Sequence, residues 1–149
     1  MTDIRPAQPH DATALVPLMQ TYYAGSPVPL TVDPVAMREH LIAMSKPNPI
    51  GGLLVATQGP QPVGFALLYF GFSTRALRRT VTLNDLFVAP SVRRQGIARL
   101  LMQATFDWAQ AQDCVAVDWV TRTSNATAQH LYEQVGTRES GWLHYQHVL

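Results

Sequence analysis

The fold is decided by the stretch Val81-Thr82-Leu83-Asn84-Asp85-Leu86-Phe87-Val88, then Ala89-Pro90-Ser91-Val92, then Arg93-Arg94-Gln95-Gly96-Ile97-Ala98. Its first part is apolar enough for a buried strand, and apolar residues after Gly96 recur at the spacing of one helix face up to Gln110. The first N–H groups of a helix have no intrahelical partner and carry the positive end of the macrodipole, so they bind anions. The stretch therefore predicts an anion site, with Gly96 allowing an oxygen to approach the backbone closely.

The same loop excludes better-known phosphate motifs. No Gly-Lys-Ser/Thr follows the strand, so it is not a Walker loop. The third glycine and the ribose-binding acid of the dinucleotide fingerprint are also missing. A single glycine pattern also occurs in ordinary tight turns, so the preceding strand and the following helix carry the prediction. A nucleotide-binding domain that uses this loop in its own way stays open as an alternative.

Two motifs resemble a known family. Arg93-Arg94-Gln95-Gly96-Ile97-Ala98 resembles the Arg/Gln-x-x-Gly-x-Gly/Ala signature of the GNAT N-acetyltransferases, and that family's Leu-x-Val-x-Pro stands before it at Leu86, Val88 and Pro90. Further along the chain, Asn125, Ala128, Leu131, Tyr132 and Gly136 resemble the family's Asn-x-x-Ala-x-x-Leu-Tyr-x-x-x-Gly helix. The two motifs in this order are more specific than either one, and the resemblance is firm from Leu83 to Gly136. Within the family, Leu83–Val88 and the tail Trp142–Leu149 are most similar to the diamine and polyamine acetyltransferase branch.

This resemblance implies one GNAT domain over residues 1–149 of α+β class. A central mixed, mostly antiparallel twisted sheet would carry helices on both faces and a splayed parallel strand pair at the cofactor. The implied co-substrate is acetyl-coenzyme A, with no metal. Its pyrophosphate would meet the backbone N–H groups from Arg94 to Arg99, and its pantetheine arm would pair with the freed edge of the Leu86–Val88 strand. The expected cofactor-binding residues are Leu86, Phe87, Val88, Arg93, Arg94, Gln95, Gly96, Ile97, Ala98, Arg99, Asn125 and Tyr132.

The resemblance also suggests how protons are managed. The tyrosine that matches Tyr132 is the general acid in the family, and Asn125 lies two helical turns before it on the same face. A core tyrosine and a helix-capping asparagine are the structural alternatives. Close relatives often carry glutamate where this chain has Asn84, which cannot act as a base. Asp85, expected on the opposite face of the strand, is either a base acting through water or a structural carboxylate. Further candidate bases are His130, His144, Glu133 and the Tyr22/Tyr23 pair.

We expect the acetyl group to pass in a ternary complex to a primary amine of a small molecule: a polyamine, a diamine or an amino acid. The expected acceptor pocket comprises the Tyr22–Val32 loop, Trp119 and a strand from Trp142 to Tyr145, and it is more aromatic than acidic. A cationic polyamine would be expected to need more carboxylates than these stretches contain. Acetylation of protein N-termini or lysines stays open, as does a coenzyme A or acyl-coenzyme A sensor without turnover.

Composition bounds the partners and the location. The 149 residues suffice for one domain with a substantial core, and 47% hydrophobic with 14% charged residues argue against disorder. A formal net charge of +1 predicts no nucleic-acid partner. Cys114 is the only cysteine, so no disulfide framework or thiolate metal cluster is expected. The longest apolar run, Val63 to Phe72, is too short to span a bilayer, and no signal peptide is recognised at the N-terminus. We expect a cytoplasmic protein without membrane partners, and a homodimer that pairs through its last strand.

The remaining segments carry alternating helix and strand signals. We expect a strand at Ile4-Arg5, a helix from an Asp11 cap to about Tyr23, a breaker loop at Ala24–Pro29, a helix from an Asp33 cap through Met44, a hairpin of Gly51–Thr57 and Val63–Phe70, a strand Cys114–Val120 parallel to Leu83–Val88, a helix Asn125–Val135 ended by a left-handed Gly136, and a last strand Trp142–Val148.

Overall fold

The computed structural model describes every residue from 1 to 149. The elements are β1 (Thr2–Pro6), α1 (Ala12–Ala24), α2 (Pro34–Met44), β2 (Gly51–Gln58), β3 (Gln61–Ser73), β4 (Arg78–Val88), α3 (Ile97–Ala111), β5 (Val117–Asp118) and α4 (Ala126–Val135), with short 3₁₀ turns η1 (Pro9–Asp11) and η2 (Pro90–Val92). The 5-stranded sheet has the order β1-β2-β3-β4-β5. Neighbours are antiparallel except β4 and β5, which are parallel. The predicted mixed α+β architecture is confirmed.

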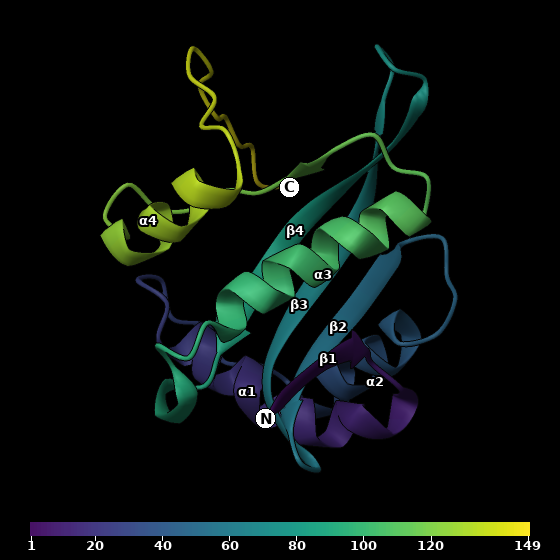
Figure 1. The fold of residues 1–149 in the computed structure, drawn as a ribbon, viewed down its shortest axis with the longest axis vertical. Coiled ribbons are helices and arrows are strands. Elements are labelled where there is room, and N and C mark those ends of the chain that lie inside the picture. The colour runs from purple at the N-terminus through teal and green to yellow at the C-terminus, as the bar shows by residue number, and fades with distance from the viewer.

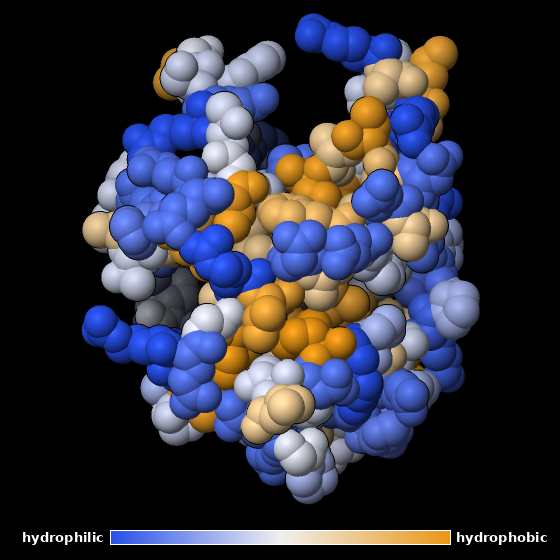
Figure 2. Space-filling view, viewed as in Figure 1, coloured by the Kyte–Doolittle hydropathy of each residue, from blue (hydrophilic) through white to orange (hydrophobic).

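Helices cover both faces of the sheet (Figure 1). α1 and α2 pack on one face against residues such as Leu53, Val55 and Phe65, and α3 packs on the other against Leu54 and Leu68. Because both of its faces are covered, β2 is buried along nearly its whole length, unlike a strand with one wet face. Figure 2 shows apolar residues at the surface on both sides of the polar band that follows α3. No helix is long and apolar enough to cross a membrane.

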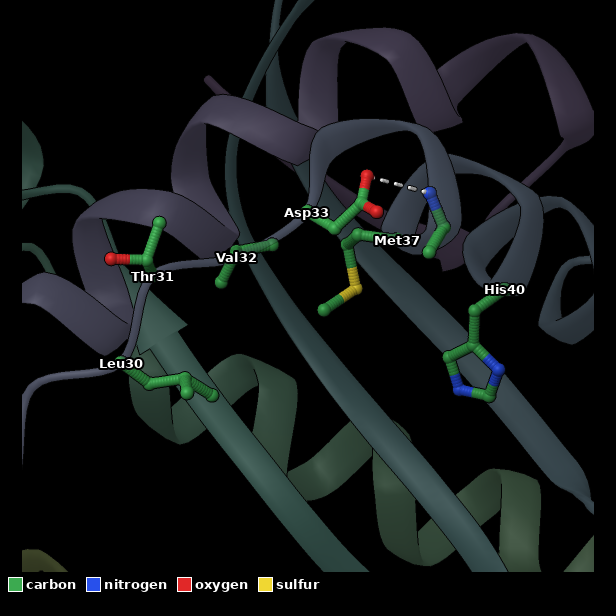
Figure 3. A pocket seen from close by; sticks show the side chains of 7 residues that line it. Leu30, Thr31, Val32, Asp33, Met37 and His40 are labelled. Atoms are coloured by element: carbon green, nitrogen blue, oxygen red, sulfur yellow. Dashed lines mark hydrogen bonds between the residues drawn. The ribbon is translucent and has the colours of Figure 1, made fainter.

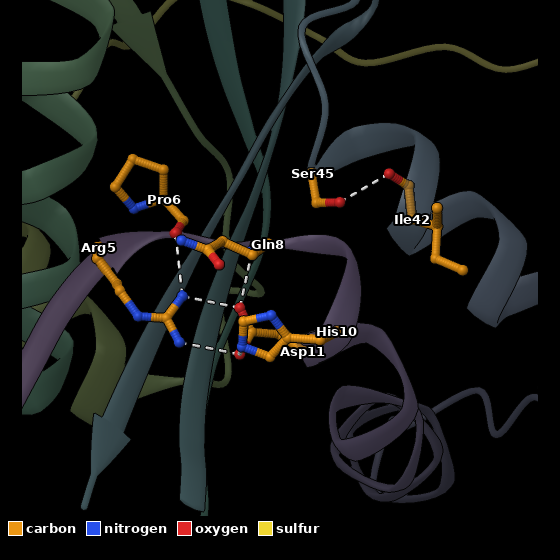
Figure 4. Close-up of polar contacts among 7 residues, drawn as sticks. All are labelled: Arg5, Pro6, Gln8, His10, Asp11, Ile42 and Ser45. Carbon is orange, nitrogen blue, oxygen red and sulfur yellow. Dashed lines mark hydrogen bonds and ion pairs between the residues drawn. The ribbon is translucent and has the colours of Figure 1, made fainter. Parts of the chain in front are cut away.

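The helix starts follow the predicted signals, with one correction. The Asp33 carboxylate accepts hydrogen bonds from the backbone N–H groups of Val35 (2.9 Å) and Ala36 (3.3 Å), as a helix cap does. Asp11 precedes α1 as predicted, but its side chain does not cap the helix. Instead it accepts two bonds from the Arg5 guanidinium, at 2.8 and 2.9 Å, and one from the Gln8 backbone (Figure 4). This partly buried ion pair fixes β1 to the start of α1.

β4 carries a β-bulge at Asn84 that decides where Asp85 points. Leu67 of β3 pairs with Asp85 and Leu68 pairs with Leu83, so Asn84 has no partner. Leu83 packs under α3, and regular alternation would put Asp85 on the same face. The extra residue turns Asp85 to the face covered by α1 instead. The expectation that Asn84 and Asp85 lie on opposite faces is wrong, because the Asn84 amide donates to the Asp85 carboxylate at 2.8 Å.

The C-terminal third departs furthest from the sequence prediction. β5 is only Val117–Asp118, shorter than the expected Cys114–Val120, and it pairs with β4 only at Val81 and Thr82. The two parallel strands therefore separate after Thr82, as expected for a splayed pair. The predicted last strand Trp142–Val148 does not form, and Trp142 is 82% exposed. The predicted homodimer was expected to pair through this strand. Because the strand does not form, the homodimer stays a prediction.

The end of α4 also differs from the expectation. Gly136 is not left-handed: its φ of −151° is extended backbone. A Cβ built on Gly136 would lie 2.6 Å from the Trp119 ring, so a close approach of that ring accounts for the glycine.

Candidate active site

The loop between β4 and α3 presents a row of unpaired backbone donors. The N–H groups from Arg94 to Arg99 have no hydrogen-bond partner in the protein, and all but the buried Ile97 and half-buried Ala98 belong to exposed residues. Arg94 (φ 63°) and Gly96 (φ 78°) are both left-handed, which bends the loop into the first turn of α3. Gly96 is the N-cap and supplies no side chain, and a Cβ built on it would meet no atom within 4 Å. This arrangement fits an anion, as a helix N-terminus preceded by a bent loop does.

The three arginines near this loop, Arg93, Arg94 and Arg99, make different contacts. The Arg93 Nε donates to the Val88 carbonyl at 3.0 Å, and its guanidinium lies over the Phe87 ring at 5.6 Å. Arg93 therefore fastens the loop to the end of β4. Arg99 donates to the Gln134 side chain of α4. The exposed Arg94 makes no hydrogen bond to the protein through its guanidinium, so it is the side chain of this loop with the most freedom to contact a phosphate.

The edge of β4 that faces β5 is open beside this loop. Pairing with β5 ends at Thr82, so from Leu83 to Val88 that edge contacts no strand. An extended chain with amide groups can pair with such an edge as an added strand would. The predicted residues Leu86, Phe87 and Val88 lie on this stretch, and Phe87 and Val88 are also part of the core. Their side chains hold the edge in place and leave the backbone available.

Asp85 is a buried carboxylate without a cationic partner. It is 4% exposed, and its oxygens accept from the Tyr23 hydroxyl (3.2 Å) and the Asn84 amide (2.8 Å). The ion pairs of the protein involve other residues. Burial, and after it the negative charge of Asp85, raises the pKa of Tyr22 to about 12, and the same causes raise the pKa of Tyr23. Both phenols therefore stay protonated as donors around this carboxylate at neutral pH.

Tyr132 approaches the same region from α4. Its ring packs edge-on against Trp119, with centroids 5.7 Å apart, and burial raises the pKa of its hydroxyl. Tyr132 also contributes, as the smallest of several causes, to the raised pKa of Tyr22, so the two hydroxyls share one neighbourhood. Asn125 caps α4 by accepting from the Ala128 N–H at 3.1 Å. The Tyr132 hydroxyl is thus a protonated group of α4 that lies near Tyr22.

Several other predicted residues lie apart from this site. His130 contacts Gln134, and Glu133 pairs with Arg138, both on the exposed side of α4. The tail from Trp142 to Tyr145 is exposed, and it takes no part in the pocket that Leu30, Thr31 and Val32 line with α2. No group of His, Cys, Asp or Glu side chains is arranged to hold a metal ion.

Two residues that packing brings together, His40 and Tyr69, carry no signal in the sequence. His40 of α2 places Nε2 2.8 Å from the Tyr69 hydroxyl of β3. His40 also lines a pocket of about 270 Å³ together with Leu30, Thr31, Val32, Asp33, Ala36 and Met37 (Figure 3). His40 and Tyr69 each place a polar group on an otherwise apolar face. This pattern is also common in ordinary core packing, so it does not mark a functional pair. Only the docking of α2 on the sheet shows that they meet.

Comparison with known proteins decides the family. The sequence model of the acetyltransferase (GNAT) family matches residues 15–137, which is most of the chain. The chain belongs to the GNAT family of acetyltransferases. This GNAT protein is therefore an acyltransferase, and the loop and sheet edge described above lie within the matched residues. It is 31% identical over 144 residues to an uncharacterized N-acetyltransferase, YhfO, of Bacillus subtilis (strain 168), covering 96% of this chain and 95% of that one.

Other relatives match this GNAT acetyltransferase over part of their length. A thialysine N-epsilon-acetyltransferase of Caenorhabditis elegans is 29% identical over 96 residues, which cover 62% of this chain and 59% of that protein. Among solved structures, a probable acetyltransferase superposes with a TM-score of 0.83 at 28% identity, covering 99% of this chain and 97% of that chain. A possible acetyltransferase of Clostridium difficile 630 has a TM-score of 0.85 at 16% identity, which supports the fold alone.

Proposed function

We propose that this GNAT acetyltransferase transfers an acetyl group from acetyl-coenzyme A directly to the primary amine of a small molecule in a ternary complex. The observation that carries the proposal is Asp85. A buried carboxylate that has only neutral hydrogen-bond donors around it costs stability unless a cation joins it. An ammonium group beside Asp85 offsets that cost, so the site selects an amine. This carboxylate lies on the strand whose edge and following loop fit the co-substrate.

The residues fit acetyl-coenzyme A. The unpaired N–H groups from Arg94 to Arg99 match the oxygens of a diphosphate, with Gly96 keeping the approach open and Arg94 available as a counter-charge. The open β4 edge at Leu86–Val88 matches the amides of a pantetheine arm. When bound, this co-substrate supplies an activated thioester. A free N–H on that edge is placed to donate to a carbonyl oxygen, as an oxyanion donor does.

Asp85 and Tyr132 divide the proton chemistry. The amine arrives as an ammonium, and Asp85 binds it and takes up its proton, directly or through water. Tyr22 and Tyr23 stay protonated because their pKa values are raised, so they orient the carboxylate without competing for that proton. The Tyr132 hydroxyl, protonated for the same reason, holds the proton that the departing sulfur requires. No activated nucleophile stands in the site, so a covalent acetyl-enzyme is not expected.

The acceptor we favour is a small molecule with one amine to be acetylated. Asp85 is a buried carboxylate without an ion pair, whereas Asp11 pairs with Arg5 and Asp33 caps α2; one free carboxylate suits a single ammonium better than a polyamine. The relatives include thialysine and D-amino-acid N-acetyltransferases, whose names point to small-molecule amines. A coenzyme A sensor without turnover is the competing function. Such a sensor gives no role to a buried carboxylate beside the binding edge.

The test is a panel of small primary amines with acetyl-coenzyme A, read by release of the coenzyme A thiol. Wild type is expected to turn over a subset of amines, and Asp85→Asn to lose at least about 100-fold in kcat/KM. Asp118→Asn is the matched control, because this exposed carboxylate lies on the neighbouring strand and bonds only Thr82. Equal rates in wild type and Asp85→Asn would refute the assignment of Asp85. Binding without turnover of any amine would favour the sensor.

A further inference from the structure

The His40–Tyr69 pair joins α2 to the face of the sheet that carries Asp85. The space beside Asp85, where the amine is proposed to bind, is called the acceptor site below. His40 Nε2 and the Tyr69 hydroxyl are 2.8 Å apart, and the two rings lie 6.0 Å apart at 35°. Both side chains are half-buried, so the contact is partly shielded from water. A hydroxyl can donate or accept, and an imidazole nitrogen accepts when neutral and donates when protonated. The direction of this hydrogen bond therefore depends on the charge of His40.

Tyr69 connects this pair to Asp85. Leu67 of β3 pairs with Asp85, and Tyr69 follows two residues later, so it projects from the same face of the sheet. Diagonal neighbours of this kind are within reach of an aromatic side chain. The negative charge of Asp85 contributes, after burial, to raising the pKa of Tyr69. Burial, then Asp85, and as the smallest cause Tyr69 raise the pKa of Tyr23, whose hydroxyl bonds Asp85, so these groups lie close together.

We propose that His40 is a positioning residue for amine binding and acts through the Tyr69 hydroxyl; this rests on the proposed function. Neutral His40 accepts a hydrogen bond from the Tyr69 O–H. The lone pairs of the Tyr69 oxygen then face the acceptor site and accept an N–H of the bound ammonium. Protonated His40 donates to that oxygen instead. The hydroxyl hydrogen then turns to the acceptor site and opposes the ammonium. Protonation of His40 thus raises the KM for the amine and leaves kcat nearly unchanged.

The groups around His40 permit this switch. On α2, Arg38 and Glu39 are exposed, Arg38 donates to Thr13 of α1, and Asp33 shares the pocket but is engaged as the helix cap. The sheet presents Tyr69 directly and Asp85 behind it, and α1 presents Tyr22 and Tyr23. The titratable group in hydrogen-bond contact with the imidazole is Tyr69. The charge of His40 is therefore felt at the acceptor site mainly through that hydroxyl.

The first test compares the pH dependence of the amine KM between pH 5.5 and 8.5. Relative to His40→Gln, whose amide can accept a hydrogen bond but carries no charge, wild type is expected to lose about tenfold more amine affinity between pH 8.5 and pH 5.5. Tyr69→Phe should abolish that difference, so His40→Gln adds nothing in a Tyr69→Phe background. His147→Gln, in the exposed tail, is the matched control and should behave as wild type. Identical profiles in wild type and His40→Gln would overturn the proposal.

A second test needs no turnover. The imidazole nitrogens of His40 are followed by NMR as the pH is changed, in wild type, Tyr69→Phe and Asp85→Asn. Tyr69→Phe should change the chemical shift of the His40 Nε2 that contacts the Tyr69 hydroxyl, and Asp85→Asn should change it through that hydroxyl. His40 nitrogen chemical shifts that ignore both substitutions would overturn the coupling. If wild type acetylates no amine while the coupling is present, the proposed function fails and the link between His40 and Asp85 stands.

Discussion

Replacing Gly96 by glutamate tests the anion loop most sharply, because the chain offers a matched control in Gly59. Both glycines are left-handed, with φ of 78° and 60°, and a Cβ built on either meets no atom within 4 Å. A left-handed non-glycine residue costs about 1–2 kcal/mol. Both variants should therefore lose a similar amount of stability, or about 2–8 °C in the unfolding midpoint for a domain of this size. Only Gly96 lies at the N-terminus of α3.

The two variants should separate in their affinity for acetyl-coenzyme A. A carboxylate about 5 Å from a phosphate charge costs roughly 1 kcal/mol in water and roughly 3 kcal/mol at an effective dielectric constant of 20. A diphosphate presents more than one such charge, and the new side chain also fills the space in front of the loop. We expect Gly96→Glu to raise Kd at least about tenfold. Gly59→Glu, in the turn between β2 and β3, should keep the wild-type Kd.

Thermal unfolding with and without acetyl-coenzyme A measures both effects together. Ligand at about a hundred times its Kd stabilises the wild type by roughly 2.7 kcal/mol, or about 5–10 °C. The Gly59→Glu variant should show this full shift from a lower starting midpoint. The Gly96→Glu variant should start equally low and lose most of the shift. Equal ligand shifts in the two variants would refute the assignment of the loop as the anion site.

Two further predictions concern single side chains. Tyr132→Phe removes a proton donor and keeps the ring, so it should lower kcat about 100-fold and leave the Kd for acetyl-coenzyme A within about twofold. Steady-state kinetics measure kcat and calorimetry measures Kd. An unchanged kcat would contradict the role of Tyr132. The hydrogen bonds from Arg5 hold the pKa of Asp11 below its usual value, so the ion pair stabilises the fold above about pH 4 and this stabilisation is lost as the pH falls through the lowered pKa. Asp11→Asn should cost about 1.5–3 kcal/mol at pH 7 and flatten the acid limb of stability measured by urea unfolding; an acid limb as steep as that of wild type would count against it.

Local signals were sufficient for most of the fold. The periodic apolar face after Gly96 predicted α3, and the Asp33-Pro34 start predicted α2, because each depends on neighbours within a few residues. The unpaired backbone N–H groups of the loop were predicted from the same signal, the start of α3 at Gly96. The prediction of a last strand at Trp142–Val148 was wrong. Alternating apolar and polar residues show that a segment suits a sheet edge, but they do not show that it has a partner strand there.

The acceptor side of the site needed tertiary structure. A bulge is one unpaired residue, and nothing in the run from Leu83 to Val88 marks Asn84 as the extra one. Without the bulge, Asp85 could not be placed beside Tyr23. The His40–Tyr69 contact joins residues 29 positions apart and depends on how α2 docks on β3. Such pairings are set by packing, so single-sequence reasoning on the motifs alone missed them.

The measurement that tests the central claim most directly is release of the coenzyme A thiol from acetyl-coenzyme A, with and without an accepted amine. The intact mass of the protein is recorded in parallel. Direct transfer predicts thiol release only when the amine is present, in equal amount with acetylated amine, and no acetyl group left on the protein. A burst of thiol without amine, together with an acetylated protein, would contradict direct transfer. Tight acetyl-coenzyme A binding with no release for any amine would contradict the transferase itself.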